Sequence, residues 1–192
     1  MLSERQKEER IIRKKSILDG ALKVFKAHGI EKTTMDEIAH ESGFGKATLY
    51  YYFASKDEVF IAIMEDGWKK LWAGIESKIS NDLNPREKFM GIINEMAEIV
   101  KANKILYGFL FTAPNHIHDE TKQTWRTYQQ RLYAILKSII EEGISKKEFL
   151  NVNPQILMKA IGGLFHGLLI ENKDNLDNNE FEIMLKNFLK PE

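Results

Sequence analysis

The sequence predicts an all-α protein of about nine helices, with a three-helix N-terminal domain that contains a helix-turn-helix and a larger helical C-terminal domain. Apolar residues recur at helical spacing along most of the 192-residue chain. Capping residues, prolines and glycines mark where one amphipathic stretch ends and the next begins. The sequence shows no strand pattern, internal repeat or low-complexity tract. We place the domain boundary between residues 56 and 57.

The first predicted helix ends at His28-Gly29, after a series of apolar residues at helical spacing. These residues are Ile17, Leu18, Ala21, Leu22, Val24 and Phe25. The polar residues from Met1 to Arg10 form either a frayed extension or an early start to this helix. For the basic cluster Arg13-Lys14-Lys15, a solvated face and a contact with phosphates or the minor groove remain equal alternatives.

Residues 34–53 predict a helix, a tight turn and a second helix. Thr34 and Glu37 have the spacing of a capping box at the start of the first of these helices. Met35, Ile38 and Ala39 give that helix an apolar stripe. Gly43 suits a left-handed conformation in the turn that follows.

The second helix of this motif, about Lys46 to Phe53, exposes residues suited to DNA. Leu49 and Phe53 should face the core, whereas the three tyrosines at positions 50–52 fan around the helix and cannot all be buried. Tyrosine hydroxyls and Lys46 are good donors to phosphate oxygens and base edges. Helix-turn-helix proteins place this helix in the major groove. The pattern favours DNA binding, and a helical hairpin with surface tyrosines is the alternative.

Several short segments between about Ile11 and Phe60 carry a specific pattern: Gly29, Thr33-Thr34, Asp36-Glu37-Ile38-Ala39, Ser42-Gly43, Leu49-Tyr50-Tyr51-Tyr52-Phe53 and Ser55-Lys56-Asp57-Glu58. They resemble the N-terminal domain of the TetR family of transcriptional regulators. One position departs from the family: Gly45 stands where a Ser or Thr usually caps the recognition helix, so the side-chain acceptor is missing.

The resemblance implies operator DNA as a partner, and we assign contacts accordingly. Lys46 and Thr48 are expected at base edges, and Ala47 can touch a thymine methyl group. Phosphate contacts are expected from five residues with hydroxyl or amine donors: Thr33, Thr34, Tyr51, Tyr52 and Lys56. Tyr50 either packs or touches the DNA backbone. A lysine at position 56 opposes the helix dipole, which indicates that another interaction, such as a phosphate contact, holds it there.

The C-terminal domain, residues 57–192, contains the remaining helices. They are expected at about residues 55–79, 85–103, 105–111, 120–145, 154–171 and 180–189. Their starts carry clear capping signals: Ser55 with Glu58, Asn84-Pro85 with Glu87, and Asn153-Pro154.

The helix over residues 154–171 tolerates three internal glycines, Gly162, Gly163 and Gly167. Each costs roughly 1 kcal/mol relative to alanine, which indicates close approach of a neighbouring backbone. In TetR proteins the last two long helices pair across a two-fold axis, so the resemblance implies a homodimer; a buried core helix is the alternative. The implied interface residues are Leu157, Ile161, Leu164, Phe165, Leu168, Phe181, Met184, Leu185 and Phe188.

The resemblance also implies a small hydrophobic or aromatic effector that binds in the C-terminal domain and releases a repressor from its operator. Candidate pocket residues are the aromatic and methionine side chains Trp68, Trp72, Phe89, Met96, Phe109, Trp125, Tyr128 and Phe165, each of which is also well suited to a plain core. Two rivals remain open. One is a DNA-binding protein of this fold without a small-molecule effector, acting through a protein partner or DNA occupancy. The other is a helical interaction protein without operator binding.

The composition of the chain limits which other classes of protein it can belong to. The chain has no cysteine, so disulfides and thiol catalysis are excluded, and no secretory signal is evident, so we expect a cytoplasmic protein. Net charge is zero overall, but residues 1–56 carry 11 basic and 8 acidic residues, a net charge of +3. His116, His118, Asp119 and Glu120 are adjacent in a predicted loop, where solvation explains them better than metal binding. We predict no enzyme activity and no cofactor.

Overall fold

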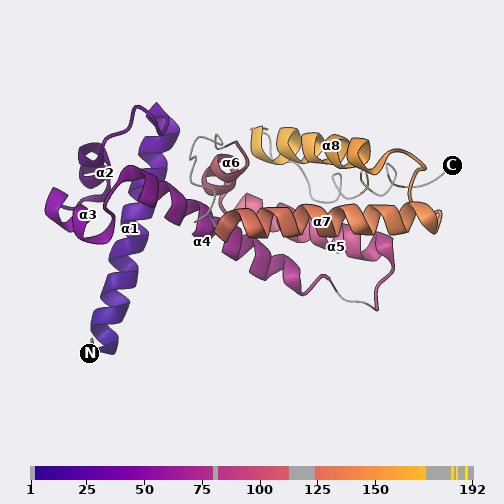
Figure 1. Cartoon of the computed structure of the whole chain (residues 1–192), viewed down its shortest axis with the longest axis horizontal. Coiled ribbons are helices and arrows are strands. Elements are labelled where there is room, and N and C mark those ends of the chain that lie inside the picture. The colour runs from indigo at the N-terminus through magenta and orange to yellow at the C-terminus, as the bar shows by residue number, and fades with distance from the viewer. Residues whose placement is uncertain are drawn as a thin grey trace. The chain divides into compact units, whose positions relative to one another are not determined.

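The computed structural model describes residues 3–79, 82–112 and 124–171, together with Ile183, Leu185 and Leu189 (Figure 1). Over this part of the chain the protein contains eight α-helices and no strand, which confirms the predicted all-α class. The helices are α1 (Glu4–His28), α2 (Met35–Ser42), α3 (Lys46–Tyr52), α4 (Lys56–Glu76), α5 (Pro85–Ala102), α6 (Lys104–Thr112), α7 (Thr124–Ser145) and α8 (Pro154–Phe165). A π-helical segment, His166–Glu171, follows α8 directly.

Residue contacts divide the chain into two compact units. The first holds the described residues up to Asp66 together with Thr112, and the second holds those from Gly67 to Phe111 and from Thr124 onward. The division falls after Asp66, within α4, whereas the sequence places the domain boundary after Lys56, the first residue of that helix. The early turns of α4 carry the buried residues Val59, Phe60 and Ile63, so this part of the helix belongs to the core of the first unit.

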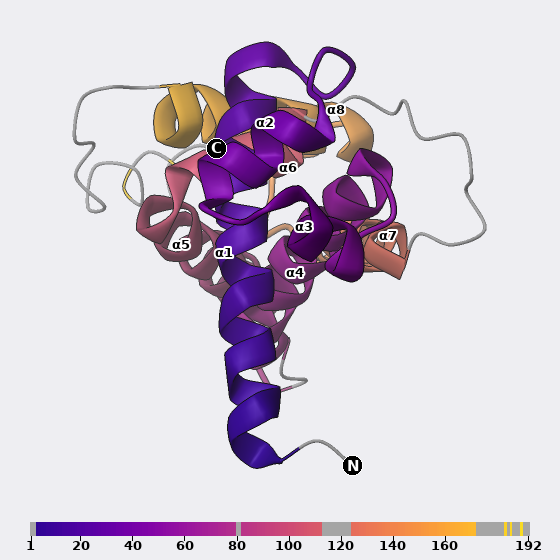
Figure 2. The same cartoon turned by 90° about the vertical axis from the view of Figure 1, so that its left-hand side faces the viewer.

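In the first unit, α1 and α2 pack closely. Gly20 permits this approach, because a Cβ atom there would lie only 2.8 Å from Ser42 Cα. An ion pair of 3.1 Å between Lys23 Nζ and Glu41 Oε1 also joins the two helices. α1 starts early, with a capping box formed by Ser3 and Gln6. Its N-terminal turns project beyond α2 and α3 (Figures 1 and 2), which settles the alternatives for residues 4–10 in favour of an early helix start.

In the second unit, α5 packs along α7, and α7 packs on α8 (Figure 1). The core combines apolar residues from each helix, including Trp68, Ile92, Ile140 and Leu157. Phe89 and Phe149 meet edge to face, with ring centroids 5.7 Å apart.

The helix starts follow the capping signals. Asn84 and Glu87 form the capping box expected before α5, and Asn153 Oδ1 accepts a hydrogen bond from Gln155 N before α8. At α4 the box is incomplete: Ser55 Oγ accepts from Glu58 N, but the Glu58 carboxylate accepts from Ala54 N instead of from the capping residue.

The helix ends follow the sequence less closely. α4 ends at Glu76, three residues before the expected Ile79. α8 changes to π-helical geometry after Phe165, next to its glycines, where the α-helix is intrinsically weak.

Candidate nucleic-acid interface and apolar cavity

The helix-turn-helix forms as the sequence predicts. Thr34 Oγ1 accepts a hydrogen bond from Glu37 N at 3.2 Å, and Glu37 Oε2 accepts one from Thr34 N at 2.7 Å. The Glu37 carboxylate accepts hydrogen bonds from the backbone N–H and from the hydroxyl group of Thr34, and these two bonds hold the pKa of the carboxyl group below its ordinary value. Gly43 ends α2 with φ 74° and ψ 20°, the left-handed conformation in which a Cβ atom would be strained. Local chemistry therefore fixes both the start of α2 and the turn that positions α3.

Two sides of α3 differ sharply. Leu49 and Phe53 are buried, as predicted, and they anchor α3 to the first unit. Tyr50 and Tyr51 are 47% and 69% exposed, and Tyr52 is half-buried. Gly45 caps α3 without any side-chain hydrogen bond, which confirms the missing acceptor at this position. Tyr50 and Tyr51 thus present their side chains at the surface, and none of the three tyrosines is fully buried.

The leading end of α3 carries the three residues expected at base edges. Lys46 and Ala47 are exposed, and Thr48 is half-buried. Lys46 Nζ lies 2.8 Å from Asp36 Oδ1, and this interaction raises the pKa of the lysine above its usual value. The lysine therefore has a carboxylate partner in the first turn of α2, and a base contact requires it to leave that partner.

Lys56 makes a contact that sequence reasoning did not foresee. Its Nζ donates hydrogen bonds to Glu31 O at 2.6 Å and to Thr33 O at 3.0 Å. The ammonium group therefore ties the start of α4 to the segment before α2. This clamp supplies a structural reason for a lysine at an unfavourable helix end.

Thr33 and Thr34 lie in different surroundings. Thr33 is only 2% exposed, and its hydroxyl group donates to Gly29 O at 2.7 Å, so its side chain faces the interior in this structure. Thr34 is exposed at the N-terminus of α2. Of these two predicted phosphate contacts, only Thr34 presents its side chain to solvent.

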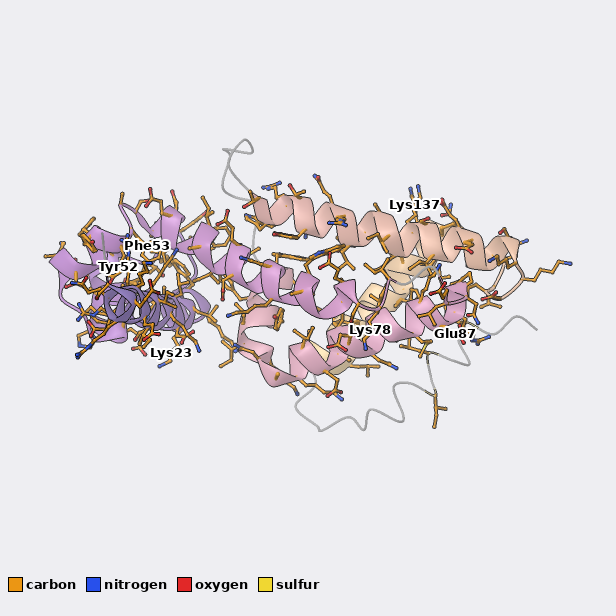
Figure 3. The ribbon with its side chains drawn as sticks, turned by 90° about the horizontal axis from the view of Figure 1, so that it is seen from below. Lys23, Tyr52, Phe53, Lys78, Glu87 and Lys137 are labelled. Atoms are coloured by element: carbon orange, nitrogen blue, oxygen red, sulfur yellow. The ribbon has the colours of Figure 1, made fainter. Side chains whose placement is uncertain are left out.

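Arg10 is the residue that sequence reasoning missed. Its guanidinium carbon lies 5.6 Å from the ring centroid of Tyr51 and 5.9 Å from that of Tyr52. Lys14 Nζ lies 5.6 Å from the Phe53 ring, and Figure 3 shows Tyr52 and Phe53 beside α1. The basic side of α1 thus meets the aromatic side of α3. No local signal relates these positions, because they are far apart in the sequence.

The second unit contains a cavity of about 220 Å³. Its wall is mostly aromatic and aliphatic and comprises Trp68, Phe89, Ile93, Met96, Phe111, Leu132, Tyr133, Leu136, Ile140, Met158, Ile161, Gly162, Phe165 and His166. Four of the eight predicted pocket residues are among them: Trp68, Phe89, Met96 and Phe165. None of the described residues of the wall is a Lys, Arg, Asp or Glu.

The other four predicted pocket residues lie elsewhere. Trp72 packs under Arg131, whose guanidinium carbon is 4.2 Å from the ring centroid, and beside Tyr128 at 6.4 Å. Trp125 is buried, and the guanidinium carbon of Arg126 lies 5.1 Å from the centroid of its ring. Phe109 is half-buried. None of these four side chains lines the cavity.

The predicted dimer residues divide into three groups. Four are buried within the single chain: Leu157, Ile161, Phe165 and Leu185. Leu164 and Leu168 are half-buried, and Phe181, Met184 and Phe188 lie outside the described residues. The outward side of α8 instead carries Ile156, which is 64% exposed, and Gly163, whose Cβ position has no atom of the described residues within 4 Å beyond its own helix backbone.

Two further predictions concern metal binding and membrane-spanning helices. The loop with His116, His118, Asp119 and Glu120 lies outside the described residues. Within the described part of the chain, no group of three or more His, Asp or Glu side chains is arranged to hold a metal ion. None of the described helices is both long and apolar enough to cross a membrane.

The exposed, basic and aromatic α3 that follows the left-handed turn defines a helix-turn-helix DNA-binding protein. Residues 17–63 match the family described as "Bacterial regulatory proteins, tetR family", and residues 82–169 match "Tetracyclin repressor-like, C-terminal domain". The chain belongs to the TetR family of transcriptional regulators.

Relatives cover most of the chain at low identity. The HTH-type transcriptional regulator BetI of Brucella anthropi is 24% identical over 163 residues, which is 84% of this chain and 81% of BetI. The HTH-type transcriptional regulator YfiR of Bacillus subtilis is 25% identical over 202 residues, covering 96% and 93% of the two chains. These relatives are transcriptional regulators and not enzymes, in agreement with the sequence-based prediction.

Solved structures share the fold. AibR in complex with isovaleryl coenzyme A and operator DNA superposes with a TM-score of 0.78 at 18% identity, covering 93% of this chain and 98% of that one. The ketosteroid transcriptional regulator KstR2 of Mycobacterium tuberculosis gives a TM-score of 0.81 at 16% identity, with coverage of 94% and 96%.

Proposed function

We propose that this TetR-family regulator is a cytoplasmic, homodimeric repressor that a small, neutral and mainly apolar ligand releases from its operator. The observation that carries the proposal is the continuity of α4. Its first residue, Lys56, clamps the segment before the helix-turn-helix, and Trp68, three turns later, lies in the wall of the apolar cavity. A ligand that displaces Trp68 therefore acts on the same helix that holds the DNA-binding motif.

On the DNA side, the proposal assigns base contacts to Lys46, Ala47 and Thr48, which lead the recognition helix. Thr34, Tyr51 and Tyr52 are assigned to phosphates, with Tyr50 beside them. Arg10 joins this set because it stacks on two tyrosine rings that face solvent or lie near it. Two such surfaces must reach major grooves about 34–36 Å apart, which requires a dimer.

On the ligand side, release is a shift between two conformations of the dimer. The two conformations differ in the spacing of the recognition helices, and the ligand must bind one conformation more tightly than the other. A tenfold preference corresponds to a coupling free energy of about 1.4 kcal/mol. AibR, which has the same fold, is described with both an acyl coenzyme A and operator DNA, and this supports a ligand-binding role for the C-terminal domain.

Selection of binding sites from random duplex DNA tests the DNA-binding part. We expect a palindromic site, with affinity measured by fluorescence anisotropy that falls at least tenfold in Lys46→Ala. Failure to enrich any sequence would leave a helical interaction protein as the better account.

A thermal-shift screen followed by anisotropy tests the ligand part. A compound that stabilises the chain should also weaken operator binding, because it favours one dimer conformation. If stabilising compounds leave the operator affinity unchanged, the protein acts through a protein partner or through DNA occupancy alone.

A further inference from the structure

We infer that the ligand carries a carbonyl-type hydrogen-bond acceptor, which binds the indole N–H of Trp68, on a neutral apolar or aromatic body. This inference specifies the ligand class of the cavity and rests on the proposed ligand-binding role. The observation behind the inference is an unpaired polar atom. Trp68 is 1% exposed, and its Nε1 is fully buried without a hydrogen-bond partner among the described residues.

The surroundings of the Trp68 ring offer little to this donor. Phe111 meets the ring edge to face at 5.8 Å, and Phe165 meets Phe111 in the same manner at 6.2 Å. All three side chains lie in the cavity wall. Buried polar groups in proteins are nearly always hydrogen-bonded, so an unpaired N–H on a ring that lines a cavity is a group to which an incoming acceptor can bind with a gain in affinity.

The wall also limits the charge of the ligand. Among the described residues it contains no Lys, Arg, Asp or Glu side chain, and the polar side chains among them are Tyr133 and His166 in addition to the Trp68 indole. A carboxylate or ammonium group placed here would lose its hydration without gaining a counter-ion. The cavity therefore favours a ketone, ester or amide oxygen over a charged group.

The volume of the cavity limits the size of the ligand. An apolar cavity of about 150 Å³ accommodates benzene. The 220 Å³ available here therefore has room for one ring with a short substituent, or for a branched acyl group of similar size. Acetophenone meets these requirements, and two close analogues isolate its features: α-methylstyrene replaces the carbonyl oxygen with a methylene group, and benzoate adds a negative charge.

Trp125 provides an internal control. Its Nε1 is also buried without a partner among the described residues, but it does not line the cavity. In a ¹⁵N-labelled full-length chain, the three tryptophan indole signals can be assigned from single Trp→Phe variants. Acetophenone should shift the Trp68 indole proton downfield, α-methylstyrene should not, and the Trp125 indole should be unchanged by both.

Calorimetric titration without DNA measures the affinities. We expect acetophenone to bind about tenfold more tightly than α-methylstyrene and at least tenfold more tightly than benzoate. Trp68→Phe should abolish the preference for the ketone over the alkene, and Trp125→Phe should retain it. If Trp68→Phe does not fold, the indole shifts in the unmodified chain decide the question.

Several results overturn the inference. Equal binding of acetophenone and α-methylstyrene removes the role of the Trp68 donor, and equal binding of benzoate removes the preference for a neutral ligand. Absence of binding by all three probes shows that the cavity does not take ligands of this class. None of these results affects the DNA-binding proposal, which the duplex selection tests in the absence of ligand.

Discussion

Lys46 at the start of α3 forms an ion pair with Asp36 in the first turn of α2, with 2.8 Å between Nζ and Oδ1. Both side chains are largely exposed, so the pair adds little to stability. It matters for DNA binding instead, because the carboxylate neutralises the cation expected at a base edge and also repels phosphates.

Asp36→Asn should therefore increase DNA affinity. Removing the carboxylate frees Lys46, and we expect binding to any duplex to strengthen about two- to fivefold at low salt, with a steeper salt dependence. Anisotropy titrations at several salt concentrations measure both quantities. Glu41→Gln is the matched control, since it removes the same charge from α2 but its partner is Lys23. An equal gain in both variants would show that net charge, and not the release of Lys46, is responsible.

Lys56→Met should lower stability. The methionine keeps a long apolar side chain but loses the hydrogen bonds to the carbonyl oxygens of Glu31 and Thr33. We expect the free energy of unfolding to fall by about 1 kcal/mol, a value reduced for the partial exposure of the ammonium group. Chemical denaturation measures this change.

Lys32→Met is the control for Lys56→Met, because Lys32 is an exposed lysine in the same segment before α2. It loses the same charge and should keep the stability of the unmodified chain. Should Lys56→Met retain full stability while its DNA affinity becomes less salt-dependent, the phosphate contact predicted from the sequence would be the correct role for this residue.

Gly20→Ala should destabilise the first unit. A Cβ atom at position 20 would lie 2.8 Å from both Ser42 N and Ser42 Cα, and backbone atoms cannot move aside by changing rotamer. We expect a loss of about 1–3 kcal/mol, measured by thermal or chemical unfolding.

Gly91→Ala in α5 is the control for Gly20→Ala, because position 91 has room for a Cβ atom. The nearest atom to its Cβ would be Lys78 Cβ at 3.7 Å, an ordinary contact distance. Here we expect a gain of up to about 1 kcal/mol, because alanine is the better helix former. Similar responses of the two variants would mean that helices α1 and α2 can separate without loss.

The features that the sequence predicts correctly depend on residues that lie close together in the chain. Capping boxes at Thr34 and Asn84 involve residues three apart, so the starts of α2 and α5 follow from local chemistry. The burial of Leu49 and Phe53 follows from helical spacing in the same way. Contacts between distant segments do not follow from the sequence, so it did not predict the hydrogen bonds of Lys56 to Glu31 and Thr33 or the stacking of Arg10 on Tyr51 and Tyr52.

Trp68 and Trp72 illustrate the limit within one helix. They lie four residues apart on α4 and share a face, so the sequence predicts the same pocket for both. In the structure Trp68 lines the cavity, while Trp72 packs against Arg131 and Tyr128 of α7. Which helix covers each turn of α4 depends on tertiary packing, and periodicity carries no information about it.

The outward side of α8 leads to the last prediction. Gly163 lies in a helix interior, at a cost of about 1 kcal/mol relative to alanine, yet beyond its own helix backbone no atom of the described residues lies within 4 Å of its Cβ position. Ile156 on the same helix is 64% exposed. A second copy of the chain packed against this side would account for both features, because glycine permits close approach of two helix backbones and the partner would cover the isoleucine.

Gly163→Leu should therefore weaken dimerisation by at least tenfold, since a leucine side chain would prevent that approach at a cost of about 1–3 kcal/mol. Sedimentation equilibrium over a range of concentrations measures the dimerisation constant. Gly91→Leu in α5 introduces the same side chain away from α8 and should leave that constant unchanged. A Gly163→Leu chain that dimerises normally and is more stable than the unmodified protein would place the dimer interface elsewhere, because the substitution would then act only through helix propensity.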